Sequence, residues 1–388
     1  TITLPVITKI YNASELGKYQ LLISIITSLG VISSLKYEMA IILPKKDAVA
    51  KKVFILCFYV LMSFCSLLYI LLFFKDNFIL RLFNANSILE IAWLIPIGVF
   101  FFGFFEIIKS SLLRKKNFSS FSIARVYQII STQIFIIFLG LFNPSYVFLL
   151  TSFILGNIIS STIFLRESLF RIKTDVSKSL IDISLKYKKF PLVNTLMVFA
   201  NTISNELPVF FIVKYHTTEI LGYYMLATRI LVIPMNIIGT SIGKVYFQRA
   251  SQIANQNKSY LFDIYKNTKL QLIKIGLVPF ISLGLFASSL IDVFFGYNWN
   301  TSSIIIQIMT MGMFFKFITS PISTTFTVLN KQELSFYITI FSLFLRFCAM
   351  LYFRESLFSM LLALSISSAS YYIIFHILVY KILILKKG

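Results

Sequence analysis

Long apolar segments alternate with short polar segments along the whole chain. A helix that crosses a bilayer needs about 20 mostly apolar residues. The sequence holds eleven segments of this kind and one partial segment at its start, where Thr1 stands within apolar residues, so we expect a truncated first helix. The pattern predicts an all-α integral membrane protein of about a dozen transmembrane helices. The predicted spans are 1–9 (partial), 17–43, 52–74, 88–108, 119–142, 145–165, 191–213, 218–243, 270–294, 302–328, 334–353 and 356–380.

The polar segments between the spans differ in charge on the two sides of the membrane. If the loop after residue 43 is cytoplasmic, most of the 36 Lys and Arg residues fall in cytoplasmic loops. Cytoplasmic loops of membrane proteins carry such an excess of Lys and Arg. We therefore predict that both ends of the chain lie in the cytoplasm. The formal charge of +21 then reflects membrane topology, and we expect no nucleic-acid partner.

Composition supports a membrane protein and gives little sign of catalytic chemistry. The chain is 57% hydrophobic and 13% charged, whereas soluble proteins carry roughly 25% charged residues. Its three cysteines and two histidines do not have the spacing of metal ligands, and we expect no metal or cofactor. The segment GTSIGKV (239–245) has too few residues between its glycines for a phosphate loop, and Val245 stands where that loop needs Ser or Thr.

Two segments of the chain resemble each other. Residues 4–25 align with residues 207–230 when two single-residue insertions are allowed. An even number of predicted spans separates the copies, so they face the same way, as parallel repeats do in transporters. We predict two six-helix bundles, residues 1–184 and 185–388, divided within the basic loop 166–190. The matched positions include Pro5 with Pro208, Tyr11 with Tyr215, Glu15 with Glu219 and Gly17 with Gly222.

Ionisable residues inside the spans are the candidate functional residues. A charge at the bilayer centre costs about 2.5–3.5 kcal/mol on insertion scales, so such residues usually face a wet cavity or a partner. Arg229 and Lys316 lie near the middle of their predicted spans and are the strongest candidates. Arg346 is also deep, but its short span suggests that it reaches outward. Lys36 and Glu38 stand two positions apart, so we expect them on different helix faces with different partners.

Polar residues also form stripes on two predicted helices. Arg125, Gln128 and Thr132 share one helix face, and a second face holds Asn194, Asn201 and Asn205, with Glu206 beside it. Each stripe is explained equally well by hydrogen bonds between helices or by a polar cavity. The charges deep in the spans are mainly positive. A cavity of that sign favours an anionic ligand such as a phosphate or pyrophosphate.

The sequence LKYEMAIILP (35–44), followed by a Lys-rich loop, resembles a motif of the Wzx-type polysaccharide repeat-unit flippases. These proteins form part of the MATE-like (MOP) superfamily. The likeness extends over residues 4–52, and Lys36 replaces the arginine that is usual in the family. It implies two bundles around a central cavity and a multi-pass protein of the bacterial inner membrane.

The resemblance also implies a function. Relatives move an undecaprenyl-pyrophosphate-linked oligosaccharide across the membrane for surface polysaccharides such as the O-antigen of lipopolysaccharide, alongside polymerase and assembly proteins. The expected pyrophosphate site comprises Arg229, Lys316, Arg125 and Lys36, and the expected polar or coupling residues are Glu38, Asn201, Asn205, Glu206 and Gln128. Two alternatives stay open: a cation-coupled drug or metabolite exporter, which predicts a buried acidic site, and a membrane enzyme of polysaccharide assembly. The short outer loops favour a transporter over an enzyme.

Overall fold

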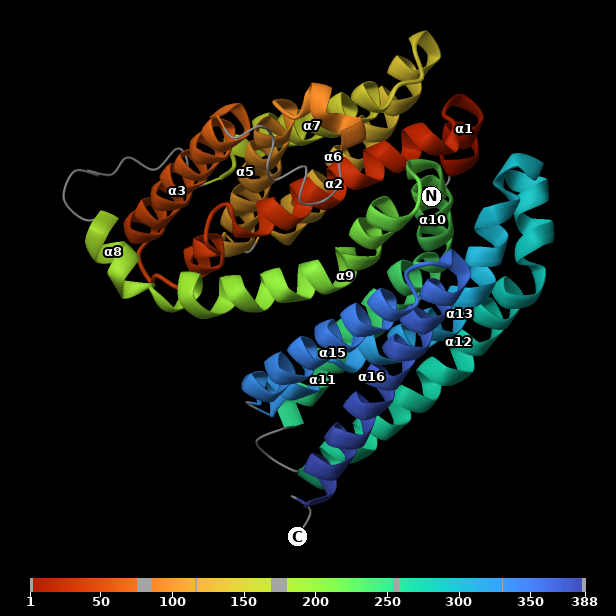
Figure 1. The fold of residues 1–388 in the computed structure, drawn as a ribbon. Helices are drawn as coiled ribbons and strands as arrows, with labels where there is room; N and C mark the ends of the chain where they lie inside the picture. Colours follow the sequence, from red (N-terminus) through yellow and green to blue (C-terminus); the bar gives the residue numbers. More distant parts are fainter. Residues whose placement is uncertain are drawn as a thin grey trace. The chain divides into compact units, whose positions relative to one another are not determined.

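The computed structural model describes residues 3–74, 86–115, 117–168, 180–253, 258–329 and 331–385 (Figure 1). Within these ranges the regular structure is helical and no β-strand occurs. Such an architecture suits a chain in lipid, because a helix satisfies its own backbone hydrogen bonds. The all-α prediction is confirmed.

The number of spans agrees with the apolar pattern. Ten helical segments in the described ranges are long and apolar enough to cross a membrane. An eleventh results if α10 (Thr218–Leu231) and the helix that follows it count as one span bent by 40°. The predicted partial span at 1–9 corresponds to the short helix α1 (Leu4–Ile10). The prediction of about twelve membrane helices is therefore consistent with the structure.

The chain folds into two compact units. One comprises Val6–Gly222, and the other comprises Tyr223–Gly388 together with Thr1–Pro5. The division into bundles 1–184 and 185–388 remains a prediction. Residues 169–179, which belong to the predicted divide, lie outside the described residues.

The first unit is built around α5, which packs against three other helices of the unit, α2, α3 and α7, while α6 packs along α7. A buried cluster that includes Phe105, Leu112 and Phe164 holds α5 to its neighbours. Its helical elements are α2 (Ala13–Ile32), η1 (Tyr37–Ile42), α3 (Asp47–Phe74), η2 (Asn86–Ile91), α5 (Leu94–Arg114), α6 (Phe118–Phe142), α7 (Tyr146–Leu165), α8 (Leu180–Lys186), η4 (Phe190–Asn194) and α9 (Thr195–Tyr215).

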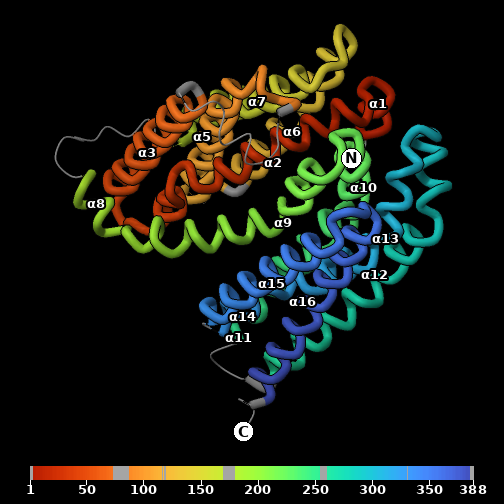
Figure 2. Tube along the Cα trace, in the orientation of Figure 1, coloured from red at the N-terminus to blue at the C-terminus, as the bar shows by residue number. Residues whose placement is uncertain are grey.

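The second unit is built around α13, which packs against α12 and α16 (Figure 2). α10 and α11 are joined by a π-helical turn, η5, that begins directly after Pro234. A proline removes a backbone hydrogen bond, which explains the break at this point. The remaining elements are η5 (Met235–Gly239), α11 (Thr240–Ile253), α12 (Lys258–Phe294), η6 (Tyr297–Trp299), α13 (Asn300–Thr319), η7 (Ser320–Ile322), α14 (Thr325–Val328), α15 (Gln332–Tyr352) and α16 (Leu357–Leu385).

One predicted span differs from the structure at its end. Residues 17–43 were expected to form a single helix, but α2 ends at Ile32. Leu35 and Lys36 adopt left-handed backbone angles, with φ of 49° and 56°, and a 3₁₀ helix follows at Tyr37–Ile42. Left-handed residues cannot continue a right-handed helix, so the chain turns at the start of the LKYE sequence.

Candidate functional site

The turn brings Lys36 and Glu38 together. The ammonium Nζ of Lys36 lies 2.9 Å from Oε1 of Glu38, and the hydroxyl of Ser34 donates to Oε2 of Glu38 at 2.6 Å. The Glu38 side chain is buried. The expectation that Lys36 and Glu38 have different partners is wrong, because it assumed a continuous helix. Lys36 stays a proposed cavity residue, but its charge is balanced within the motif.

Arg114, at the end of α5, holds the next part of the motif in place. Its Nη1 donates to the carbonyl oxygens of Ile41 and Ile42 at 3.2 Å each and to that of Pro44 at 2.6 Å. Its Nε and Nη2 donate to Oδ1 of Asp47 at 3.1 and 2.8 Å. The last carbonyls of a helix need partners from elsewhere, and one guanidinium supplies them here. No motif or spacing in the sequence singles out Arg114.

Tyr37 ties the same motif to α8. Its hydroxyl donates to the carbonyl oxygen of Ser184 at 3.2 Å. Burial raises the pKa of the Tyr37 phenol above its ordinary value, with a smaller contribution from Cys57. The phenol therefore keeps its proton at neutral pH and remains a donor. The motif 35–44 is thus a folded turn with contacts to α5 and α8.

The polar stripe on α6 is held together by its own contacts. Arg125 donates from Nη1 to Oε1 of Gln128 at 3.2 Å, and Thr132 donates to the backbone carbonyl of Gln128 at 2.7 Å. Gln128 and Thr132 are buried, whereas the Arg125 side chain is exposed. Arg125 is therefore available to a ligand, while Gln128 orients it.

The stripe on α9 divides into two parts. Asn201 and Asn205 are exposed, and Asn205 Nδ2 donates to the backbone carbonyl of Asn201 at 2.8 Å. Glu206 instead accepts a hydrogen bond of 2.5 Å from the hydroxyl of Ser24 on α2. Gln20 Nε2 donates to the same hydroxyl at 3.2 Å. A hydrogen bond between helices therefore accounts for Glu206, whereas the two asparagines face outward from their helix.

In the second unit, a cavity of about 400 Å³ lies between α11 and η7. Its polar lining consists of amide, hydroxyl and ammonium groups from Asn236, Thr240, Lys244, Ser320 and Thr324. None of the lining residues is acidic. Its other lining residues are Met235, Gly239, Gly243, Phe247 and Pro321.

The two strongest candidates, Arg229 and Lys316, lie a few residues before lining residues of this cavity. Arg229 is exposed on α10, about two helical turns before Asn236. Lys316 is partly buried on α13, one turn before Ser320 and two turns before Thr324. Neither Arg229 nor Lys316 lines the cavity itself.

One hydroxyl of the cavity lining lacks a hydrogen-bond partner. Oγ1 of Thr324 is buried and has no hydrogen-bond partner. A buried polar group without a partner costs free energy, which a polar ligand recovers. The cavity can therefore hold an anion beside Lys244 and a hydroxyl-rich group beside Asn236, Thr240 and Thr324. The sequence signal for this site is a spacing of four residues between polar side chains. It relates Asn236, Thr240 and Lys244, and it relates Lys316, Ser320 and Thr324.

Arg346 differs from its expected position. The short span suggested that it reaches outward, but its side chain is 7% exposed. Its guanidinium lies over the ring of Tyr371 on α16, with Cζ at 5.7 Å from the ring centre. An aromatic face attracts a cation, so Arg346 packs between helices α15 and α16.

The solved structures that resemble this chain include transporters and a flippase. A multidrug resistance MATE family transporter of the MOP superfamily, in an inward-facing conformation, shares 16% identity at a TM-score of 0.77, covering 100% of this chain and 96% of its own. The lipid II flippase MurJ shares 17% identity at a TM-score of 0.75, covering 96% of this chain and 84% of its own. A MOP superfamily transporter from Pyrococcus furiosus, described by the reverse polarity of its binding pocket, shares 14% identity at a TM-score of 0.64, covering 97% and 88%. These likenesses define a membrane protein with the MATE-like fold.

The family follows from the sequence itself. Residues 6–304 match the family model described as polysaccharide biosynthesis protein, and the chain belongs to that family. No curated protein matches the sequence. Family and fold together confirm the resemblance to the flippases of polysaccharide synthesis, and the long apolar helices identify a multi-pass membrane protein.

Proposed function

We propose that this protein translocates an undecaprenyl-pyrophosphate-linked oligosaccharide across the bacterial inner membrane for surface polysaccharide synthesis. The observation that carries the proposal is the lining of the cavity between α11 and η7. It offers one ammonium, one amide and several hydroxyls, and no carboxylate. Pyrophosphate is recognised by cationic groups, and sugars are recognised by amides and hydroxyls.

The cationic residues next to the cavity extend this argument. Arg229 and Lys316 stand on the two helices that lead into it, and we assign them to the pyrophosphate. Arg125, an exposed cation of the first unit, stays a proposed substrate-binding residue. Lys36 has a weaker claim, because Glu38 already balances its charge. Asn201 and Asn205 are assigned to the sugars, whereas Glu38, Glu206 and Gln128 hold other side chains in place.

The exporter alternative predicts a buried acidic site. Among the described residues, Glu38, Glu106 and Glu15 are each within 3.0 Å of a lysine, and Glu206 accepts from Ser24. These carboxylates are used within the fold, which supports an anionic cargo. The proposal places the protein in the plasma membrane with both termini cytoplasmic, working beside polymerase and assembly proteins and without catalysing a reaction of its own.

Deletion of the gene in the source bacterium tests the proposal. We expect loss of surface polysaccharide and accumulation of the lipid-linked unit on the cytoplasmic face, measured by its protection from an impermeant glycan-modifying reagent added outside. Complementation with the intact gene should restore both. Normal surface polysaccharide together with new sensitivity to drugs would instead identify an exporter.

A further inference from the structure

A second cavity of the second unit lies apart from the one described above. It has a volume of about 560 Å³ and is lined by residues of α12, α13 and α16, which pack together. Its polar groups come from Lys269, His376, Tyr380 and Lys381, and its apolar wall is Ile273, Phe315, Ile318, Ile373 and Ile377. None of these residues lines the first cavity, and the proposed cargo site does not use them.

On each of two helices that line this cavity, a lysine lies one helical turn from an isoleucine. On α12, Ile273 follows Lys269 by one turn, and on α16, Ile377 and Ile373 precede Lys381 by one and two turns. Lys269 stands about three turns into α12 and Lys381 one turn before the end of α16. Both lysines also fall at the predicted cytoplasmic ends of their spans. The cavity is therefore an open groove with lysines at its predicted cytoplasmic end and an aliphatic surface, exposed at Ile373 and Ile377, beyond them.

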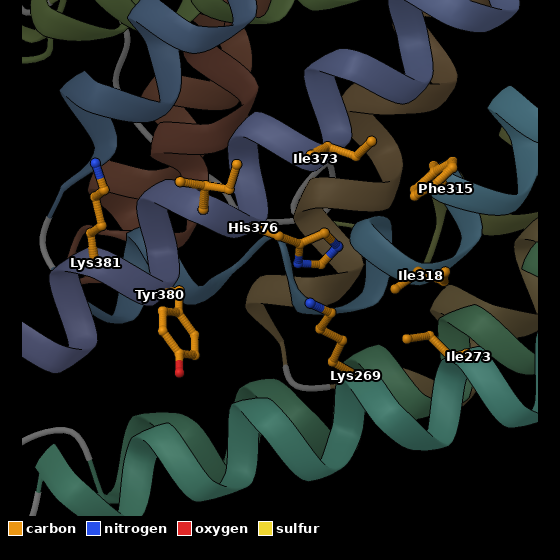
Figure 3. Close-up of a pocket in the computed structure, with 9 residues that line it drawn as sticks. Lys269, Ile273, Phe315, Ile318, Ile373, His376, Tyr380 and Lys381 are labelled. Carbon is orange, nitrogen blue, oxygen red and sulfur yellow. The ribbon is translucent and has the colours of Figure 1, made fainter.

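The ring of His376 lies beside Lys269 in the lining of this cavity. Its Nδ1 lies 2.6 Å from the hydroxyl of Tyr265 and its Nε2 lies 3.1 Å from the hydroxyl of Thr319. Figure 3 shows the ammonium of Lys269 pointing toward this ring, not away from the cavity. Lys269 is partly buried, and no lining residue is acidic. An ammonium in such a place lacks a counter-charge from the lining and favours an anion.

We propose that this cavity binds an anionic phospholipid of the cytoplasmic leaflet. The phosphate of the head group lies at Lys269, with Lys381 at the rim, and one acyl chain lies along Ile273, Ile373 and Ile377. A free phosphate would use the lysines but gain nothing from the isoleucines. A zwitterionic lipid would use the isoleucines but bring its own cation to the lysines. The order of charge and apolar surface therefore selects a lipid with a net negative head group.

Native mass spectrometry of the purified protein, titrated with phosphatidylglycerol or phosphatidylcholine, tests the proposal. We expect tighter binding of phosphatidylglycerol and a loss of about tenfold in its affinity in Lys269→Gln, because a hydrogen bond to a charged group is lost. Lys381→Gln should show a smaller loss in the same direction. Lys269→Arg, which keeps the charge, should retain binding. Thermal unfolding of each variant verifies that the protein remains folded.

Two further variants distinguish a bound phospholipid from a bound free phosphate. Lys274→Gln removes an exposed lysine of the same helix that does not line the cavity, and it should bind phosphatidylglycerol like the original protein. Ile377→Trp fills the apolar part and should weaken phosphatidylglycerol binding while leaving competition by inorganic phosphate unchanged. Equal losses in Lys274→Gln and Lys269→Gln would overturn the proposal, as would binding that Ile377→Trp does not change. Neither result bears on the cargo, which is tested through Arg229 and Lys316.

Discussion

Gly17 of α2 and Gly222 of α10 lie directly against each other. A Cβ atom built on Gly17 would overlap the carbonyl oxygen of Thr218 and stand 2.9 Å from the backbone N of Gly222. A Cβ atom built on Gly222 would overlap the carbonyl oxygen of Ala13. These two glycines occupy matched positions of the sequence repeat. The repeat therefore brings two equivalent helix starts into backbone contact, which only glycine permits.

This contact predicts that Gly17→Ala and Gly222→Ala each destabilise the protein. Overpacking costs about 1–3 kcal/mol, and here the obstacle is backbone that cannot move aside. Thermal unfolding in detergent measures the effect. Gly284→Ala is the matched control, because its Cβ would meet only a methyl of Thr310 at 3.7 Å. That variant should be neutral or slightly stabilising, and equal losses in all three would show that the close contact is not the cause.

The pairing of Lys36 with Glu38 predicts a strong coupling between them. Glu38→Ala leaves the partly buried ammonium of Lys36 without its carboxylate and should cost about 3 kcal/mol. Lys36→Arg keeps the pair and should retain stability and polysaccharide export. In a double-mutant cycle, Lys36→Ala combined with Glu38→Ala should cost clearly less than the sum of the single changes. Additive losses would contradict the pairing.

Arg114 should contribute more to stability than its ion pair suggests. Arg114→Ala removes hydrogen bonds to three carbonyl oxygens and to Asp47, and hydrogen bonds from charged groups are worth about 1.5–3 kcal/mol each at most. Asp47→Ala removes only the exposed partner and should cost less than about 1 kcal/mol. Unfolding temperatures of the two variants test the order. A larger loss in Asp47→Ala would show that the carbonyl contacts matter little.

Arg229 and Lys316 should be needed for transport but not for insertion. Arg229→Ala and Lys316→Ala should each reduce surface polysaccharide at least about tenfold, since each removes a charged contact to the pyrophosphate. Membrane fractionation should find both variants at normal levels. Lys274→Ala, an exposed cation on α12, serves as the control and should export normally. Full activity in both site variants would remove these residues from the cargo site.

The cavity between α11 and η7 makes a separate prediction. Thr240→Val keeps the shape of the side chain and removes its hydroxyl from the lining, so polysaccharide export should fall several-fold, about the value of one hydrogen bond. Lys244→Glu reverses the charge beside the proposed pyrophosphate and should abolish export. Ser241→Ala changes an exposed neighbour that does not line the cavity and should have no effect. Comparison of surface polysaccharide in the three strains tests the site; loss only in Ser241→Ala would refute it.

Residues within one helix could be assigned from the sequence, whereas contacts between distant segments could not. The stripe of Arg125 and Gln128 is real because both residues lie on α6, where a spacing of three brings side chains together. Lys36 and Glu38 were misplaced because the pattern of apolar residues continues through the point where the backbone turns left-handed. Arg346 was misplaced because its partner Tyr371 lies on another helix. Helical spacing along one segment shows neither the turn at Lys36 nor a partner on another helix.

The sequence by itself determined that this protein is an all-α membrane protein of about a dozen helices and that it resembles the flippases of polysaccharide synthesis. These properties are local, because a helix in lipid satisfies its own backbone and needs only a sufficient run of apolar side chains. Only the tertiary structure decided which polar groups come together, such as Arg114 with the carbonyl oxygens of Ile41, Ile42 and Pro44 and Lys269 with the ring of His376. Helices in a bilayer are packed by close shape and hydrogen bonding between distant segments, and the apolar pattern does not encode which faces come together.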